Sequence, residues 1–130
     1  MVNSSFQFSR PLLLKSEFEI NNDFKAEEGA NIEMKIDASV EKNVDADNRT
    51  AIVALTMKIG GRDSNYPFFI CITEQANFRW DASYDESYDK LLNQNAPALL
   101  LGYIRQMVVE LTAASPYSAY HLPFIDFTKN

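Results

Sequence analysis

The chain has 130 residues, a length typical of one domain, and we expect residues 1–130 to form a single domain. Its formal net charge of −6 opposes contact with nucleic acid phosphates and with anionic membrane surfaces. Cys71 and His121 are the only cysteine and histidine, which excludes an internal disulfide and argues against a zinc site, a Ser-His-Asp triad or a Cys-His pair.

The sequence carries no membrane or secretion signal. No apolar run approaches the roughly 20 residues that cross a bilayer. The stretch from Met1 to Phe8 lacks the basic and apolar regions of a signal peptide. We therefore expect a cytoplasmic protein that does not insert into membranes.

A long first strand is predicted, because apolar and polar residues alternate from Phe6 to Ile20. A period of two is typical of a strand with one buried face. Arg10-Pro11 interrupts the pattern, and proline removes a donor from the ladder, so we expect a bend or an edge position there. A long edge strand is also a surface on which another subunit could pair. The polar residues 21–29 predict a loop.

Two alternating stretches on either side of a turn at residues 43–48 predict the next two strands, at 32–40 and 50–59. The first is expected to meet a core with the face that carries Ile32, Met34, Ile36, Ala38 and Val40. A fourth strand is predicted at residues 66–74. It is apolar on both faces, which is typical of a central position. Short turns between these strands favour antiparallel pairing.

Large residues spaced by four predict a short helix between Asn77 and Asn95: they are Trp80, Tyr84, Tyr88 and Leu92. Acidic residues lie between them, namely Asp81, Asp85, Glu86 and Asp89. They lack the glycine and the ligand spacing of a calcium loop, so we expect a solvated acidic face rather than a metal site.

The longest helix is predicted at residues 96–114, with Asn95 as its N-cap, Pro97 in the first turn and Pro116 beyond its end. At 100° per residue its apolar residues fill an arc of about 160°, whereas a surface helix needs about 100°. The excess predicts a second packing partner, which we expect to be another subunit. The residues concerned are Leu100, Leu101, Tyr103, Ile104, Met107, Val108 and Leu111.

The aromatic tail from Pro116 onward is expected to pack on the body of the domain. Together the elements predict an α+β fold: a four-stranded antiparallel sheet with a long C-terminal helix packed on one face.

The helix and the tail carry motifs in a characteristic order. They are Pro97, the apolar run 99–101, Tyr103 with Arg105, Ser115-Pro116-Tyr117, and residues 122–127. Weaker matches are Phe6-Gln7 with Arg10, Phe18-Glu19, and Phe68 to Ile72 with Phe78. This series resembles the SecB family of protein-export chaperones, which have Tyr-Ala-Arg-Glu in the helix and later Gly-x-Phe-Pro and Leu-x-Pro-Val-Asn-Phe.

The resemblance implies an ATP-independent holdase that binds unfolded preproteins or other polypeptide clients for export through the Sec pathway. It also implies a homotetramer, a dimer of dimers in which first strands pair and long helices pack between two sheets. The implied helix contacts are Leu100, Leu101, Ile104, Met107, Val108 and Leu111. No cofactor, metal or catalytic residue is implied, and we expect that the protein is not an enzyme.

Exposed aromatic surface can bind many sequences, because burial of apolar area is non-directional. The resemblance places the clients in grooves between helix, sheet and connecting loop. The candidate client-binding residues are Met34, Phe78, Trp80, Tyr84, Tyr88 and Tyr103. The alternative is that the aromatic row only packs in the core, which is the commoner role of such a pattern.

Acidic residues on the sheet of SecB contact the motor protein SecA, and here the candidates are Glu19 and Glu74. Lys15 and Cys71 stand where other family members have acids. Relatives also usually continue beyond the position of Asn130 into a further helix and an acidic tail that contacts SecA. These departures bear on SecA contact, not on the fold or on client binding.

Two other functions remain open on the sequence. One is a SecB-like chaperone dedicated to a single client, such as the antitoxin of a toxin–antitoxin system. The other is a non-catalytic small-ligand-binding or structural α+β domain. An enzyme is the weakest alternative, because nothing positions the carboxylates and tyrosines as an acid–base pair.

Overall fold

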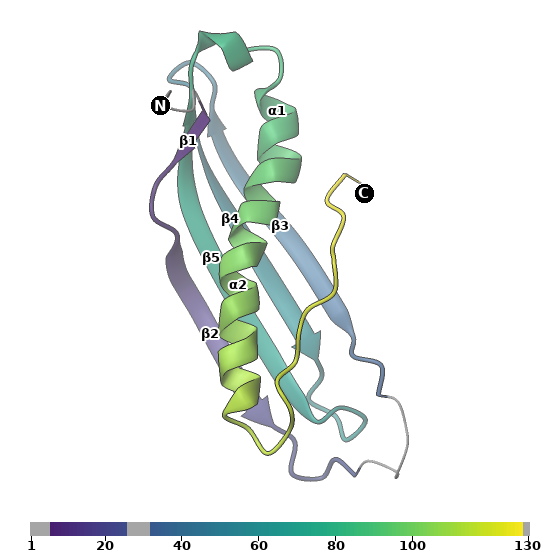
Figure 1. Ribbon diagram of the computed structural model, residues 1–130. Helices are drawn as coiled ribbons and strands as arrows, with labels where there is room; N and C mark the ends of the chain where they lie inside the picture. The colour runs from purple at the N-terminus through teal and green to yellow at the C-terminus, as the bar shows by residue number, and fades with distance from the viewer. Residues whose placement is uncertain (1–5, 26–31, 129–130) are drawn as a thin grey trace.

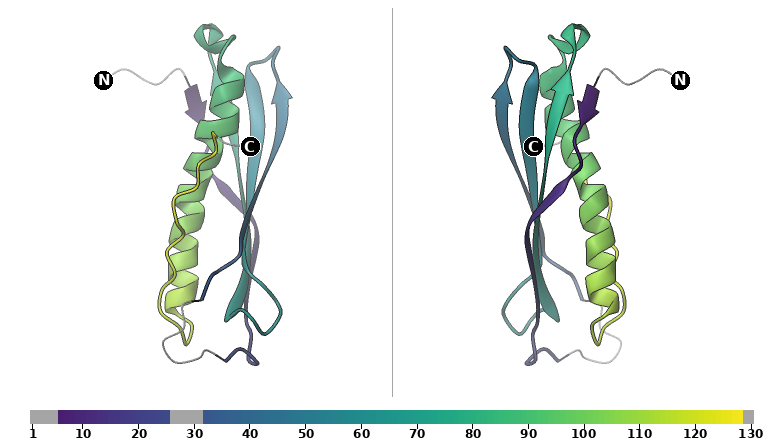
Figure 2. Two further views of the ribbon diagram at one scale, coloured as in Figure 1. Left: turned by 90° about the vertical axis from the view of Figure 1, so that its right-hand side faces the viewer. Right: turned by 90° about the vertical axis from the view of Figure 1, so that its left-hand side faces the viewer.

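The computed structural model describes residues 6–25 and 32–128, so part of the loop predicted at 21–29 lies outside the described residues. The long helix and the C-terminal segment lie on one face of a twisted antiparallel sheet (Figures 1 and 2). The predicted α+β arrangement is therefore confirmed. The extent of the domain over residues 1–130 stays a prediction.

Strand β5 (Phe68–Trp80) is the centre of the sheet. On one side it pairs with β1 (Phe6–Phe8) and β2 (Leu12–Ile20). On the other side it pairs with β4 (Thr50–Gly60), which in turn pairs with β3 (Ile36–Asp45). All pairs are antiparallel, and the order is β1-β5-β4-β3 with β2 beside β1 on β5. The predicted first strand is split where Arg10-Pro11 was expected to interrupt it.

Two strand boundaries differ from the sequence prediction. Strand β3 begins at Ile36 rather than at residue 32 and continues to Asp45. Strand β5 continues to Trp80 rather than ending at Glu74. The extension follows from pairing on both edges, since β1 and β4 both reach this end of β5. Ladder hydrogen bonds from two neighbours therefore override the helical spacing that begins at Trp80.

The helical region begins later than predicted and is continuous once it starts. After a 3₁₀ turn, η1 (Ala82–Tyr84), the chain forms α1 (Tyr88–Lys90), a π turn η2 (Leu91–Asn95) and α2 (Ala96–Ala113). The prediction of an N-cap at Asn95 is wrong, because this residue is itself helical and makes no side-chain capping bond.

The π turn η2 lies directly before Pro97. Proline cannot donate the hydrogen bond of an α-helix, and its ring clashes with the carbonyl four residues earlier. A wider turn at this point displaces that carbonyl, which explains how the helix passes through a proline without breaking. The helix ends at Ala113, before Pro116, as predicted.

The core lies between α2 and the strands β4 and β5. Alternate residues of β4 face the helix and are buried: Ala51, Val53, Leu55, Met57 and Ile59. The helix covers these two strands but not β3. The core face predicted for the third strand is therefore only partly correct, since Ile36 packs against the core but Ala38 and Val40 are exposed.

Both outer edges of the sheet lack a paired strand among the described residues, and they differ in chemistry. The β3 edge carries Asp37, Glu41, Lys42 and Asp45, all exposed. The β2 edge begins with Leu12, Leu13 and Leu14, which are 45%, 49% and 56% exposed. A register shift between Leu13 and Lys15 marks a β-bulge at this point.

The C-terminal segment returns alongside α2, and it packs on the body as predicted (Figure 1). Leu122 is buried. The side chain of Arg105 donates a hydrogen bond of 2.8 Å to the carbonyl of Pro123, and the backbone N–H of Tyr120 donates to the hydroxyl of Thr112 at 2.7 Å. These bonds fasten the segment to the helix.

Gly60, the last residue of β4, offers a test of the close packing between the end of β4 and the start of β5. Its φ is +76°, and a Cβ atom would lie 2.1 Å from the carbonyl oxygen of Phe68. We expect Gly60→Ala to lower the free energy of unfolding by more than about 2 kcal/mol, because both the backbone conformation and the contact become unfavourable.

Urea unfolding measures this change, and Gly102→Ala is the matched control. Nothing lies within 4 Å of a Cβ added to Gly102 in α2. The control should therefore raise the free energy of unfolding by about 0.5–1 kcal/mol. Equal stability of the two variants would contradict the structure at Gly60.

Candidate functional site

Aromatic side chains gather at the end of the sheet where β1 meets the end of β5. The register places Phe6 opposite Trp80 and Phe8 opposite Phe78, so the four rings share the face covered by the helical region. Tyr84 and Tyr88 join them from η1 and α1. We call this set of six residues the aromatic cluster: Phe6, Phe8, Phe78, Trp80, Tyr84 and Tyr88.

Ring contacts connect the members of the aromatic cluster. The ring centroids of Phe6 and Phe78 are 5.7 Å apart, and those of Phe6 and Tyr84 are 6.1 Å apart. Phe8 lies 6.2 Å from Phe78. Trp80 and Tyr88 stack at 4.7 Å with an interplanar angle of 11°. These separations are those of favourable aromatic pairs.

The structure thus brings together four of the six predicted client-binding residues, and their role stays a prediction. In this conformation Phe78 and Trp80 are 1% and 3% exposed, and Tyr84 and Tyr88 are half-buried, whereas Phe8 at the margin of the cluster is 47% exposed. Phe6 and Phe8 were missed as members. Their alternation was visible in the sequence, but only the pairing of β1 with β5 shows which residues they face.

The other two predicted residues lie elsewhere. Met34 packs near Gly60, at the opposite end of the sheet from Trp80. Tyr103 is 43% exposed on α2. A single site at the aromatic cluster does not include either residue, so a client that contacted all six would have to run along the molecule.

A short segment, residues 81–90, places Tyr84 and Tyr88 against the strand residues of the aromatic cluster. It is fastened to the turn between β3 and β4. The guanidinium of Arg49 in that turn makes two hydrogen bonds to the carboxylate of Asp85, Nε to Oδ1 at 2.8 Å and Nη2 to Oδ2 at 2.9 Å. These bonds lower the pKa of Asp85 and raise that of Arg49. Both side chains are partly exposed.

The predicted interface residues of α2 mostly face their own sheet. Leu100, Leu101, Ile104 and Val108 are buried in the core, and Met107 and Leu111 are half-buried against it. Their role in assembly stays a prediction. The exposed side of the helix instead carries Gly102, Tyr103, Gln106 and Glu110.

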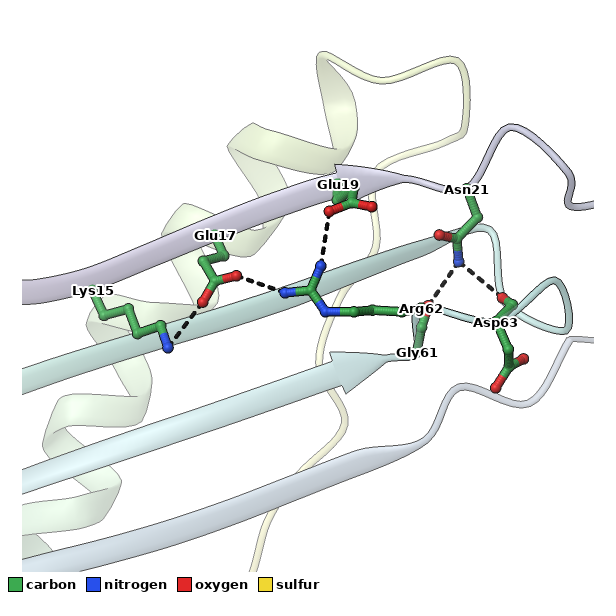
Figure 3. Close-up of polar contacts among 7 residues, drawn as sticks. All are labelled: Lys15, Glu17, Glu19, Asn21, Gly61, Arg62 and Asp63. Carbon is green, nitrogen blue, oxygen red and sulfur yellow. Dashed lines mark hydrogen bonds and ion pairs between the residues drawn. The ribbon is translucent and has the colours of Figure 1, made fainter.

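The sheet face away from α2 carries a chain of ion pairs (Figure 3). Arg62 contacts Glu17 at 2.7 Å and Glu19 at 2.8 Å, and Lys15 contacts Glu17 at 2.9 Å. Hydrogen bonds from Lys15 and Arg62 lower the pKa of Glu17. The Arg62 guanidinium also lies 4.3 Å from the centre of the Phe69 ring. Glu19, a predicted motor contact, is therefore paired within the chain.

Asn21 holds the turn that carries Arg62 in place. Its side-chain amide donates to the carbonyls of Gly61 at 2.7 Å, Asp63 at 3.0 Å and Tyr66 at 2.8 Å. Asn21 is itself buried at the end of β2. The amide thus links the edge strand to the turn between β4 and β5, and it positions Arg62 above Glu17 and Glu19.

Glu74, the second predicted motor contact, lies on the opposite face. It pairs with Leu55 and Leu13 and is 5% exposed, so its expected place as a surface acid is wrong. Its Oε2 atom has no hydrogen-bond partner, and burial raises the pKa of the carboxyl. Contact with a motor protein stays a prediction for both residues. Glu19 and Glu74 cannot contact a partner through one patch, because they lie on opposite faces of the sheet.

Two further site types can be assessed in the described residues. Within 6–25 and 32–128, no three His, Cys, Asp or Glu side chains lie close enough to hold a metal ion together. In the same part of the chain, no helix is both long and apolar enough to cross a membrane.

Comparisons with known proteins agree with this fold. The family model described as preprotein translocase subunit SecB matches residues 13–129. A solved structure of the SecB-like chaperone Rv1957 from Mycobacterium tuberculosis, in complex with a ChAD peptide from the Rv1956 HigA1 antitoxin, has a TM-score of 0.72 at 13% identity. The match covers 92% of this chain and 90% of that one.

A protein of unknown function from Streptococcus agalactiae matches with a TM-score of 0.50 at 18% identity, over 92% of this chain and 97% of that one. No curated protein sequence matches the chain. At these identities the structural likeness shows the fold alone, and it confirms the predicted fold class.

The buried acid gives a prediction about pH. Because the folded protein raises the pKa of Glu74, the carboxyl costs nothing below the usual pKa of a glutamate, where it is protonated in both states. Stability falls as the pH rises through the raised pKa, since the buried group must then ionise. We expect Glu74→Met to be more stable than the wild type at pH 7 by about 1–3 kcal/mol.

Denaturant unfolding between pH 4 and pH 8 checks this expectation, with Glu41→Met as the control. Glu41 is exposed on β3. The difference between Glu74→Met and the wild type should grow with pH, while the control difference should stay nearly constant. A Glu74→Met protein that is less stable than the wild type at pH 7 would show that the carboxylate has a partner in the folded protein.

Proposed function

The chain belongs to the SecB family of chaperones, which are non-catalytic, and we propose that it works as an ATP-independent holdase for unfolded polypeptides in the cytoplasm. The aromatic cluster is the observation that carries the proposal. Six large rings gather at one end of the sheet, and two of them, Tyr84 and Tyr88, belong to short helical turns that contain no buried residue.

Such a surface suits a client of variable sequence. Burial of apolar area contributes about 25 cal/mol per Å² without requiring a particular residue order. The unpaired edge of β2 can add backbone hydrogen bonds, which are also independent of sequence. Several weak contacts along one client raise the overall affinity through multivalency. Met34 and Tyr103, distant from the cluster, would serve as secondary contacts for a long client.

The destination of the client is the second part of the proposal. Delivery to the Sec pathway is the first candidate. A dedicated client, such as an antitoxin, is the second, and the pairing of Glu17 and Glu19 with Arg62 favours it. These acids are neutralised within the chain and offer less attraction to a basic motor surface. The chaperone from M. tuberculosis that shares the fold was solved with an antitoxin peptide. A small-ligand or structural role is the remaining alternative.

For assembly we propose a homotetramer built as a dimer of dimers, with the β2 edges forming one contact. The three exposed leucines at the start of β2 support this choice, because an edge strand with an apolar surface is stabilised by pairing. The apolar side of α2 is mostly used within the chain, so helix contacts between copies would involve Met107, Leu111 and the exposed Tyr103.

Light scattering with a reduced, unfolded polypeptide tests the holdase proposal. We expect the protein to form a stable complex with the client without ATP. A double change of Phe6→Ala and Phe8→Ala, the cluster residues on β1, should weaken binding by about tenfold, since each ring contributes apolar area. The control is Tyr66→Ala, in the turn at the opposite end of the sheet. A wild-type protein that ignores several unfolded clients would leave only a ligand-binding or structural role.

The assembly proposal has its own test at the β2 edge. Leu14→Lys should lower the solution mass from about four times the 14.8 kDa of one chain, because a charge in an apolar strand contact must be desolvated. Ile52→Lys, which changes an exposed apolar residue on β4, is the control and should leave the mass unchanged. The same mass for Leu14→Lys and the wild type would place the contact elsewhere.

A further inference from the structure

The inner rings of the proposed client site are closed to solvent in this structure, although Phe8 at its margin is 47% exposed. Trp80 and Phe78 are almost completely buried. Residues 81–90, which contain η1 and α1, pack against the cluster: Tyr88 stacks on Trp80, and Tyr84 contacts Phe6. We call residues 81–90 the cover segment. Any client that contacts Trp80 must therefore displace it.

The cover segment is held by few contacts. Neither η1 nor α1 contains a buried residue, and each is a single short turn. Tyr84 and Tyr88 are the half-buried side chains that reach from it toward the core. Short helices of this kind are marginal in water, and regions with little buried area open at low free energy. The cover segment is therefore only weakly held against the aromatic cluster.

Arg49 supplies the specific contact that keeps the cover segment down. Its side chain holds Asp85 through two hydrogen bonds, and its carbonyl accepts a bond of 3.1 Å from the backbone N–H of Trp80. One residue thus joins the end of β5 to its cover. Arg49 also has a φ of +53°, the only positive φ among the described residues other than glycine. Such a conformation is unfavourable for arginine and is often found at functional positions.

The π turn η2 gives the cover segment a defined hinge. It follows Lys90 directly, and beyond it α2 is anchored by buried residues such as Ala96 and Leu100. π turns in otherwise α-helical segments are frequent at functional sites. Rotation at the start of η2, before the fully buried Leu92, would lift Tyr88 away from Trp80 without disturbing α2.

Trp80 also carries an unused donor. Its Nε1 atom is buried and has no hydrogen-bond partner. Buried polar atoms are normally paired, so an unpaired one calls for an explanation. A carbonyl of a bound polypeptide would accept this hydrogen bond once the segment is open.

Resting on the proposed holdase function, we propose that the cover segment is a lid over the client site and that the Arg49–Asp85 pair is its latch. Opening at η2 admits an apolar stretch of the client to Phe78 and Trp80, and the Trp80 Nε1 atom donates to the client backbone. Only open molecules bind a client, so the apparent affinity is lower than the affinity of the open form. Loss of the latch increases the open fraction and therefore raises the apparent affinity.

Trp80 is the only tryptophan in the chain, so its fluorescence reports directly on the lid. The test compares the wild type with Asp85→Ala by acrylamide quenching of Trp80 and by binding of a reduced, unfolded polypeptide. We expect both the quenching constant and the client affinity of Asp85→Ala to rise by about twofold to fivefold, the range that an exposed ion pair accounts for. The client is added only in the second measurement, so the lid is also tested alone.

Asp37→Ala is the matched control, since it removes the same side chain from another exposed ion pair, with Lys35 on β3. It should change neither measurement. The double change Arg49→Asp with Asp85→Arg restores opposite charges, and Asp tolerates the backbone conformation at residue 49 better than most residues. It should return the quenching constant toward the wild-type value.

Unchanged quenching in Asp85→Ala would overturn the latch, whether or not a client binds. Increased quenching with unchanged client affinity would overturn the lid as the route to the site, while the holdase function stood. If no form of the protein binds a client, the holdase function fails by itself, and the quenching data still decide whether Arg49 and Asp85 restrain the segment.

Discussion

Pairing of β5 on both of its edges is the constraint on which the rest of the structure depends. Strand β4 follows it from Phe69 to Arg79, and β1 and β2 divide the other edge between them. At the gap between β1 and β2, Ser9 bonds to Asn77 through both its backbone N–H and its hydroxyl. The strand is therefore long enough to present an apolar face to α2, interrupted only by Glu74, and to extend as far as Trp80, where the aromatic cluster forms.

This arrangement divides the apolar surface of the chain between folding and recognition. The wide apolar arc of α2 is used mainly to cover β4 and β5, so a single chain already satisfies most of it. Apolar residues that remain exposed include the leucines of β2, Tyr103 on the helix and Phe124 in the C-terminal segment, together with Phe8, Ile32, Val40, Val44 and Ile52. Contacts with other chains must begin there, because exposed apolar groups gathered at edges are the groups that gain from further burial.

Period-two patterns predicted where the strands lie along the chain, and prolines and helical spacing predicted the break at Arg10-Pro11 and the position of α2, because these signals act locally. The errors arose where tertiary contacts decide. The spacing of Trp80, Tyr84 and Tyr88 suits a helix, but pairing with β1 and a backbone hydrogen bond to Arg49 hold Trp80 in β5. A pattern also shows which residues share a face, not whether anything covers that face. For this reason Val40 is exposed and Glu74 is buried, both against expectation, and the link between Arg49 and Asp85 had no local signal.

The different chemistry of the two sheet edges has a consequence for how copies of the chain can add to one another. Growth of a sheet without limit needs two edges that accept each other. Here the β3 edge carries exposed charges of both signs beside the partly exposed Val40 and Val44, whereas the β2 edge begins with three exposed leucines. Pairing of two β2 edges about a two-fold axis would bury the apolar edge of each copy and leave the two β3 edges outermost. The joined sheet would then end at its two β3 edges instead of adding further copies without limit.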